Sequence, residues 1–336
     1  MKTLILKTPS FETLIRIGEG LVDRLESQLG TLHESVLLAD KALPSSLIEH
    51  VAMAASCTDV VRIGVGESEK TLRTYERIVT YLSDRRYSPA TTLVALGGGS
   101  LGDIAGFVAA TYARGIKYIY VPTTLLAMAD ASVGGKTALN VRHRKNIIGA
   151  FHQAEDVFID PTLVKTLPPR EIASGMAEIV KAALIGDARL YAGIRDDNPS
   201  LEALIAGALR VKIPIVEADP FDRGRRRLLN YGHTLAHALE TYHEGRYSHG
   251  QCVASGMLHM ARGLPFEHEL SAVFARYDID TDIPYDPETL FELVTHDKKR
   301  RGDTLDIALV ETIGKGFVKT IPFHEFKTFL KGWDKT

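Results

Sequence analysis

The chain has 336 residues, of which 45% are hydrophobic, and a formal net charge of −2. A chain of this length can form one large or two medium domains, each with a buried core. Its nearly neutral charge excludes a strong overall electrostatic attraction to nucleic acid or to a membrane surface. The two distant cysteines, Cys57 and Cys252, and the lack of a signal-peptide pattern or a long apolar run favour a cytoplasmic protein that binds neither nucleic acid nor membranes.

Four short apolar runs in the first half predict β-strands at Ser35–Asp40, Val60–Gly64, Thr92–Leu96 and Tyr118–Pro122. Helical patterns separate these runs, and strands that alternate with helices form βαβ units with a parallel sheet. We therefore expect an α/β, Rossmann-like domain over residues 1–160.

A glycine-rich turn follows the third of these strands. The segment Gly97–Asp103 leads into an apolar helix at Ile104–Ala110, where backbone N–H groups and the helix dipole favour a pyrophosphate. The turn indicates a dinucleotide site, although it differs from the G-x-G-x-x-G pattern and simple packing is the alternative. Asp40 at a strand end, and Glu67 with Lys70, are candidates for binding adenosine ribose hydroxyls, with surface charge as the alternative.

Polar groups suited to an anion come next in the chain. Asp130 precedes a turn at Gly134–Lys136, and Lys145 and Asn146 follow within ten residues. Such a turn suits a phosphate or a polyhydroxylated anion, and a β-turn with solvated lysines is the alternative. Further cations, more than one phosphate requires, are Arg114, Lys181, Lys212, Arg226, Lys298 and Lys299. Their number favours a substrate with both a phosphate and a carboxylate. The basic run Arg223–Arg227 lacks interleaved aromatic residues and does not indicate nucleic-acid binding.

The pattern changes at about Asp160, where long amphipathic segments rich in Ala, Leu and Glu begin. Pro161, Pro168 and Pro169 mark the change. We expect a mostly α-helical C-terminal domain over residues 161–336, with a short return to strand at Thr304–Val310.

Three histidines in this second half have a spacing that a metal ion could use. His233 and His237 are four residues apart and so share one face of a helix, and His249 follows after a short loop. Glu178, with Lys181 three residues later on another predicted helix, is the candidate carboxylate ligand. The alternative is that the histidines make ordinary hydrogen bonds at a helix start and in the core.

Seven segments, in this order, resemble the 3-dehydroquinate synthase family. They are 97–103 (GGGSLGD), 111–115 (TYARG), 121–127 (VPTTLLA), 130–137 (DASVGGKT), 145–151 (KNIIGAF), 177–181 (AEIVK) and 229–238 (LNYGHTLAHA). The resemblance extends from about Asp40 to Val310. It implies a Rossmann-like NAD domain followed by a helical metal domain, zinc or cobalt as the metal, and a homodimer.

The resemblance also implies roles for individual residues. Glu178, His233 and His249 are the implied metal ligands, and His237 becomes an active-site histidine beside them. The groups around the substrate hydroxyls and phosphate are Asp130, Lys136, Lys181 and Asn230, with Asn146 and a partner-subunit Arg114 on the phosphate. Lys212 and Arg226 would bind the carboxylate, with Lys298 or Lys299 as a further substrate lysine. The implied NAD contacts are Gly98, Gly99, Ser100, Asp103, Thr123, Thr124, Lys136, Lys145 and Thr166, with Asp40, Glu67 and Lys70 on the adenosine side.

The implied reaction belongs to the shikimate pathway of aromatic amino acid biosynthesis. It converts 3-deoxy-D-arabino-heptulosonate 7-phosphate to 3-dehydroquinate and phosphate by transient oxidation with NAD, β-elimination, re-reduction and an intramolecular aldol closure.

Three other functions need to be weighed against this one. A sister cyclase acting on a sedoheptulose-phosphate type of substrate is disfavoured by the retained Asn230, His237, Lys212 and Arg226. A polyol dehydrogenase of the same superfold acts on a neutral substrate and would not need so many cationic side chains. A non-catalytic binding protein would not need the complete set of implied catalytic acids, bases and metal ligands.

Two residues depart from the family pattern. Gln251 follows the His249-Gly250 pair where the family has Glu, and Asp222 stands where Glu is more common. The first departure puts in doubt the hydrogen bonds that support the metal ligand.

Overall fold

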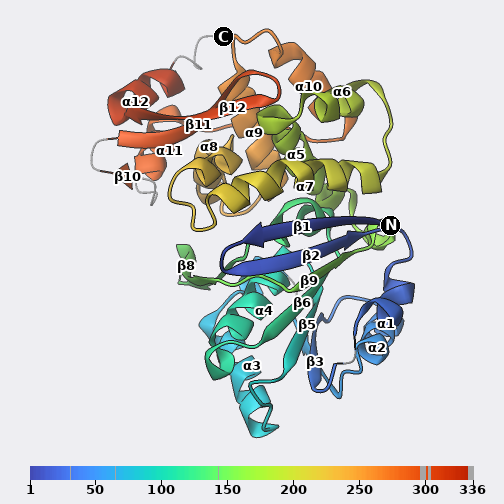
Figure 1. Ribbon diagram of the computed structural model, residues 1–336. Coiled ribbons are helices and arrows are strands. Elements are labelled where there is room, and N and C mark those ends of the chain that lie inside the picture. The colour runs from blue at the N-terminus through green and yellow to red at the C-terminus, as the bar shows by residue number, and fades with distance from the viewer. Residues whose placement is uncertain (31, 65, 143, 296–299, 302–303, 332–336) are drawn as a thin grey trace. The chain divides into compact units, whose positions relative to one another are not determined.

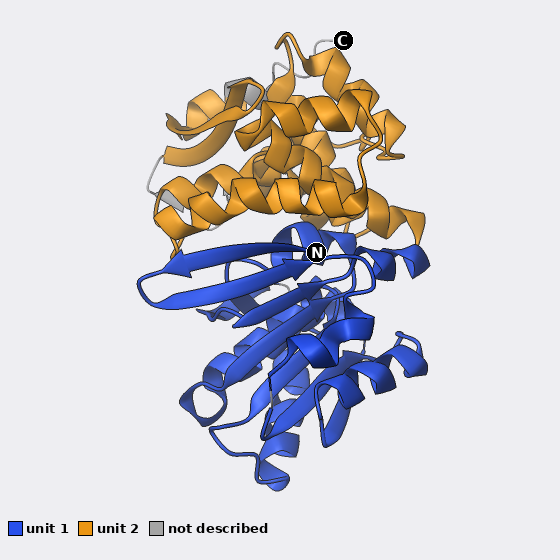
Figure 2. Ribbon diagram, turned by 45° about the vertical axis from the view of Figure 1, so that its right-hand side comes forward, with its two compact units in different colours: residues 1–167 blue, residues 168–336 orange. Residues whose placement is uncertain are grey.

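The computed structural model describes residues 1–30, 32–64, 66–142, 144–295, 300–301 and 304–331. The chain divides into two compact units, Met1–Leu167 and Pro168–Thr336 (Figures 1 and 2). We predicted a boundary at residue 160, but the side chain of Asp160 accepts hydrogen bonds from the backbone N–H groups of Gly20 and Val22. These bonds tie the segment after Asp160 to the first unit. Among the described helices, none combines the length and the apolarity that crossing a membrane requires.

The first unit contains a seven-stranded sheet with the order β1-β2-β9-β6-β5-β3-β4. The four predicted strands are confirmed as β3 (Ser35–Asp40), β4 (Asp59–Ile63), β5 (Thr92–Gly97) and β6 (Lys117–Pro122), and they pair in parallel. β9 (Asp156–Ile159) is parallel to β6 and to β2 (Phe11–Ile17), which forms an antiparallel hairpin with β1 (Lys2–Thr8). The sequence analysis did not predict β1, β2 or β9.

Helices α1 (Leu25–Gln28), α2 (Ser45–Ala54), α3 (Leu72–Asp84) and α4 (Gly99–Thr111) connect these strands, as Figure 1 shows. Val51 of α2 packs with Leu37, Val94, Ile119 and Phe158 of the sheet in a continuous apolar core. The predicted helix after β5 is present, but α4 begins at Gly99, inside the glycine segment and five residues before the predicted start at Ile104. This places the turn at the carboxyl edge of the parallel strands, where α/β proteins bind ligands.

A small second sheet in this unit pairs β7 (Lys136–Val141) with β8 (Arg144–Phe151) in antiparallel register. The short helical turns of the unit are η1 (Val22–Arg24), η2 (Glu67–Glu69), η3 (Tyr112–Arg114), η4 (Ala127–Ala131) and η5 (Pro161–Thr166). Several predicted site residues lie on these elements.

The second unit is mostly helical, as predicted. Its helices are α5 (Pro169–Gly186), α6 (Ala188–Asp196), α7 (Leu201–Ala218), α8 (His233–Tyr242), α9 (His249–Ala261), α10 (Glu267–Arg276), α11 (Pro287–Thr295) and α12 (Phe323–Lys331), with a 3-10 turn η6 (Arg225–Asn230). α5 is buried from Ala173 to Ile185 and packs against α7 and α9. The predicted strand at Thr304–Val310 is confirmed as β11 (Thr304–Thr312), which pairs with β10 (Arg300–Arg301) and β12 (Lys315–Pro322).

Candidate metal centre and cofactor-binding residues

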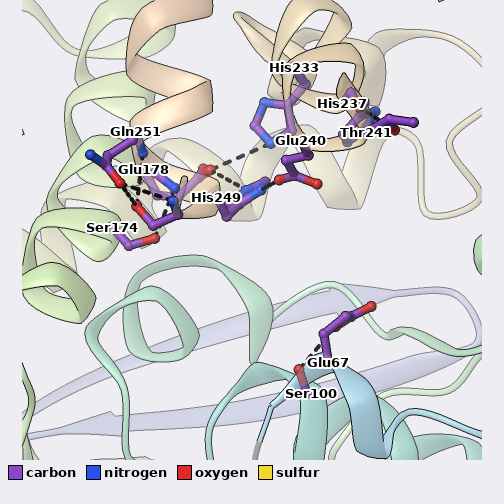
Figure 3. Close-up of polar contacts among 12 residues, drawn as sticks. Glu67, Ser100, Ser174, Glu178, His233, His237, Glu240, Thr241, His249 and Gln251 are labelled. Carbon is purple, nitrogen blue, oxygen red and sulfur yellow. Dashed lines mark hydrogen bonds and ion pairs between the residues drawn. The ribbon is translucent and has the colours of Figure 1, made fainter. Parts of the chain in front are cut away.

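Three side chains of the second unit converge on one point (Figure 3). Glu178 of α5, His233 at the start of α8 and His249 at the start of α9 each offer a ligand atom, and these atoms lie within 4.8 Å of one another. Glu178 Oε1 is 3.2 Å from His249 Nε2 and 3.5 Å from His233 Nε2. His237 does not belong to this group, although its ring lies 5.6 Å from that of His233.

The tautomers that the hydrogen bonds favour suit a metal ion. His233 Nδ1 is 3.2 Å from the carbonyl oxygen of Tyr231, and His249 Nδ1 is 2.6 Å from Glu240 Oε1. With Nδ1–H donating to the Tyr231 carbonyl, the neutral ring of His233 keeps a lone pair on Nε2. His249 would offer its Nε2 to a metal in the same way once that nitrogen gives up its proton, because its Nδ1–H is held by Glu240. Two imidazole nitrogens and one carboxylate oxygen form a ligand set typical of catalytic zinc, which leaves a position for substrate. The residues therefore fit a divalent metal.

The charges around Glu178 keep it ionised despite its burial. Burial alone would raise its pKa, but the contact of its Oε2 with Lys181 Nζ and the neighbouring imidazoles hold the pKa well below its usual range. Burial and the charge of Lys181 lower the pKa of His233. Burial alone would lower the pKa of His249 as well, but hydrogen bonds to Glu178 and Glu240 raise it to about 10. The cluster thus combines an anionic ligand with a nearby ammonium group.

Gln251, which departs from the family pattern, caps the N-terminus of α9. Its Oε1 accepts hydrogen bonds from the backbone N–H and the hydroxyl of Ser248, and its own backbone N–H donates to that hydroxyl. This is a capping box, in which Gln and Glu are both suitable. The residue that supports His249 is Glu240, which the sequence analysis missed. Its position seven residues after His233, on the same face of α8, is the signal that could have identified it.

Two glycines bring α9 close enough to complete the cluster. A Cβ at Gly250 would lie 2.3 Å from Ser174 Cα on α5, and a Cβ at Gly256 would lie 2.2 Å from the carbonyl oxygen of Gly232, just before α8. Backbone atoms cannot yield as the end of a side chain can. The positions of Glu178 and His249 therefore depend on the absence of a side chain at Gly250.

We expect Gly250→Ala to cost about 3 kcal/mol or more of unfolding free energy, because the added methyl group forces α9 away from α5. It should also weaken metal binding, since His249 is the first residue of α9. Gly193→Ala is the matched control, because a Cβ at this helical position would have no neighbour within 4 Å. Thermal unfolding and metal titration of both variants test the expectation, and equal behaviour would contradict it.

In the first unit, Lys70 connects several of the residues predicted to bind NAD. Its side chain is 3% exposed, and Nζ lies 2.6 Å from Asp103 Oδ2 and 2.5 Å from Asn146 Oδ1. Glu67 Oε1 is 3.5 Å from the same nitrogen, and Glu67 Oε2 accepts a hydrogen bond from Ser100 Oγ (Figure 3). This group lies at the start of α4, so polar side chains surround the positive end of that helix.

The other predicted NAD residues are arranged around the strand ends. Thr123 follows β6 and is buried, and Thr124 contacts the glycine turn, since a Cβ at Gly98 would lie 3.0 Å from its methyl carbon. Asp40 ends β3, where burial raises its pKa. Lys145 on β8 and Thr166 in η5 are exposed.

The substrate residues predicted in the first unit differ in local backbone structure and in exposure. Asp130 lies in η4, a π-helical turn, which is a local irregularity common at functional sites. Arg114 is exposed, and Ala113, Arg114 and Gly115 all have positive φ angles, of 49°, 69° and 120°. Lys136, exposed at the start of β7, completes the set in the first unit.

In the second unit, Lys181, Lys212 and Arg226 are buried and Asn230 is half-buried. Lys298 and Lys299 lie outside the described residues.

Comparisons with known proteins match this architecture. Residues 60–174 match the N-terminal domain of 3-dehydroquinate synthase and residues 175–300 its C-terminal domain. The 3-dehydroquinate synthase of Enterococcus faecalis (strain ATCC 47077 / OG1RF) is 35% identical over 98% of both chains. That of Halorhodospira halophila (strain DSM 244 / SL1) is 40% identical over 90% of this chain and 91% of the relative.

A solved structure of 2-deoxy-scyllo-inosose synthase, complexed with carbaglucose-6-phosphate, NAD+ and Co2+, superposes with a TM-score of 0.84. It is 25% identical and covers 98% of this chain and 100% of its own. The fold is therefore that of the sugar-phosphate cyclases. Within this class, the chain belongs to the 3-dehydroquinate synthase family.

Proposed function

We propose that the protein is a 3-dehydroquinate synthase that releases phosphate from 3-deoxy-D-arabino-heptulosonate 7-phosphate, with NAD and zinc or cobalt as cofactors. The observation that carries the proposal is the convergence of Glu178, His233 and His249 in a chain that matches this family over nearly its whole length. We also propose a cytoplasmic location, as the sequence led us to expect.

When bound, the metal would polarise a substrate alcohol and NAD would oxidise this alcohol transiently. The protein's part is to hold the ligands and the proton carriers in place. Lys181, buried against Glu178, would donate a hydrogen bond to a substrate oxygen. His237, next to His233 but outside the ligand group, would hold a proton beside the substrate, and Asn230 would bind a hydroxyl.

The anionic ends of the substrate require cations. We propose that Lys136 and Asn146 bind the phosphate, and that Lys212 and Arg226 bind the carboxylate as a charge-assisted pair. Asp130 would accept a hydrogen bond from a hydroxyl. Lys298 or Lys299 would supply a further contact to the substrate.

We propose that the glycine turn binds NAD together with Ser100, Asp103, Thr123, Thr124, Lys136, Lys145 and Thr166. The adenosine half of NAD would be bound by Asp40, Glu67 and Lys70. The ion pair between the buried Lys70 and the partly exposed Asp103 supports this proposal, because it fixes a hydrogen-bond-accepting carboxylate at the start of α4.

We further propose a homodimer in which Arg114 reaches the phosphate in the site of the partner. The support is the backbone of this segment, in which Ala113 and Arg114, two successive residues with side chains, adopt positive φ angles. Such a conformation costs free energy in residues other than glycine, and it is retained most often at functional positions.

A phosphate-release assay with the heptulosonate phosphate tests the reaction. NAD should be needed only in catalytic amount, because the oxidation is reversed before product forms. NADH absorbance should therefore stay flat while phosphate accumulates. An assay without NAD, on protein freed of bound nucleotide, is the control. Accumulation of one NADH per turnover would instead identify a dehydrogenase.

A further inference from the structure

The carboxylate of Glu240 supports the imidazole of His249 from the side opposite to Glu178. Glu240 Oε1 lies 2.6 Å from His249 Nδ1, whereas His249 Nε2 lies 3.2 Å from Glu178 Oε1 (Figure 3). The Glu240 side chain is 9% exposed, so water screens this contact little. One ring is thus held between two carboxylates, each on its own nitrogen.

The second imidazole of the cluster has a different support. His233 Nδ1 faces the neutral carbonyl oxygen of Tyr231 at the longer distance of 3.2 Å. A negative acceptor on Nδ1 increases the electron density at Nε2 more than a neutral carbonyl does. The two histidines should therefore be unequal ligands, although the sequence gives no reason to distinguish them.

We propose that Glu240 is a positioning residue of the metal centre, which orients His249, fixes its Nε2 as the ligand atom and makes it the stronger imidazole donor. The inference rests on the proposed function, because it takes Glu178, His233 and His249 as the metal site. α8 carries both His233 and Glu240, on one face. This single helix therefore provides one ligand and sets the direction of another, which belongs to α9.

The test measures metal affinity rather than turnover. Zinc binding is titrated in competition with a chromophoric chelator, and the absorption spectrum of the cobalt-loaded protein is recorded. The proteins are the unmodified enzyme, Glu240→Gln and Glu240→Ala. Glu244→Gln is the matched control, because Glu244 is an exposed carboxylate only four residues away.

We expect affinity to fall about 10-fold in Glu240→Gln, which keeps a hydrogen-bond acceptor without the charge, and about 100-fold in Glu240→Ala. The cobalt spectrum should change in Glu240→Ala, because the ring of His249 is released. The control should behave like the unmodified enzyme. If Glu240→Ala does not fold, the nearly isosteric Glu240→Gln carries the test.

Two different results would overturn the inference and are distinguishable. If the unmodified enzyme binds one metal and the Glu240 variants bind it equally well with unchanged cobalt spectra, Glu240 is only a structural link between α8 and α9. If the unmodified enzyme binds no metal at all, the proposed function fails as well.

Discussion

Glu178→Gln will lose both its metal and its activity. Glu178 is the only carboxylate in the three-residue ligand group found among the described residues, and its side chain is 1% exposed. The amide of the introduced Gln carries no charge, so the buried ammonium of Lys181 would lose its neutralising partner. The metal ion would then have to bind beside an unneutralised positive charge. Breaking a buried ion pair in this way costs about 3–5 kcal/mol. We expect kcat/KM to fall at least about 100-fold, since each 1.4 kcal/mol corresponds to a factor of ten.

Metal content after dialysis and phosphate release are the two measurements. Glu171→Gln is the matched control, because Glu171 is an exposed carboxylate in the first turn of the same helix. Removing the metal from the unmodified enzyme with a chelator should abolish activity, and zinc or cobalt should restore it. Full activity of the metal-free enzyme would refute the assignment of this site.

The second large effect is expected at Arg226, which is 2% exposed. If its guanidinium binds the substrate carboxylate, Arg226→Ala removes a charge-assisted interaction worth about 2 kcal/mol or more, so kcat/KM should fall by about 30-fold or more. Sedoheptulose 7-phosphate lacks this carboxylate. It should be a poor substrate of the unmodified enzyme, and its turnover should depend little on Arg226.

The controls separate substrate binding from local structure. Arg225→Ala removes an exposed guanidinium from the preceding position. Arg226 also donates from Nη1 to the carbonyl oxygen of Pro220, so its loss could loosen this loop, and thermal unfolding must be measured alongside activity. A preference of the unmodified enzyme for sedoheptulose 7-phosphate would assign the chain to a sister cyclase instead.

The parts of the fold that the sequence predicted are those with a strong local signal. The runs at Ser35–Asp40 and Thr92–Leu96 are apolar on both faces, as in a parallel strand covered on both sides. The hairpin of β1 and β2 was missed because neither strand is a continuous apolar run: buried and more exposed residues alternate along both, as in strands with one solvated face, whereas the predicted strands are apolar runs. β12 was missed because its Lys and Gly residues weaken the strand pattern.

In the candidate site, too, the residues with a strong local sequence signal were predicted and the others were not. Glu178, His233 and His249 belong to recognisable segments, so their convergence was expected. The spacing of Glu240 from His233 places both on one face of α8, but the contact of Glu240 with His249 depends on how α9 approaches α8, which that spacing does not encode. The function of Gln251 became visible only from the cap geometry of Ser248. Residues that act through a neighbour's orientation are therefore the ones that sequence reasoning overlooks.

The close approach of α9 at Gly250 and Gly256 has a consequence for how this protein can evolve. Since both glycines face backbone atoms, almost any substitution there disturbs the core and the ligand geometry together. Selection for a folded chain then also preserves the metal cluster. A descendant that acquires a new substrate should accordingly keep these glycines and the three ligands, and should accumulate its changes among the side chains that bind the ends of the substrate.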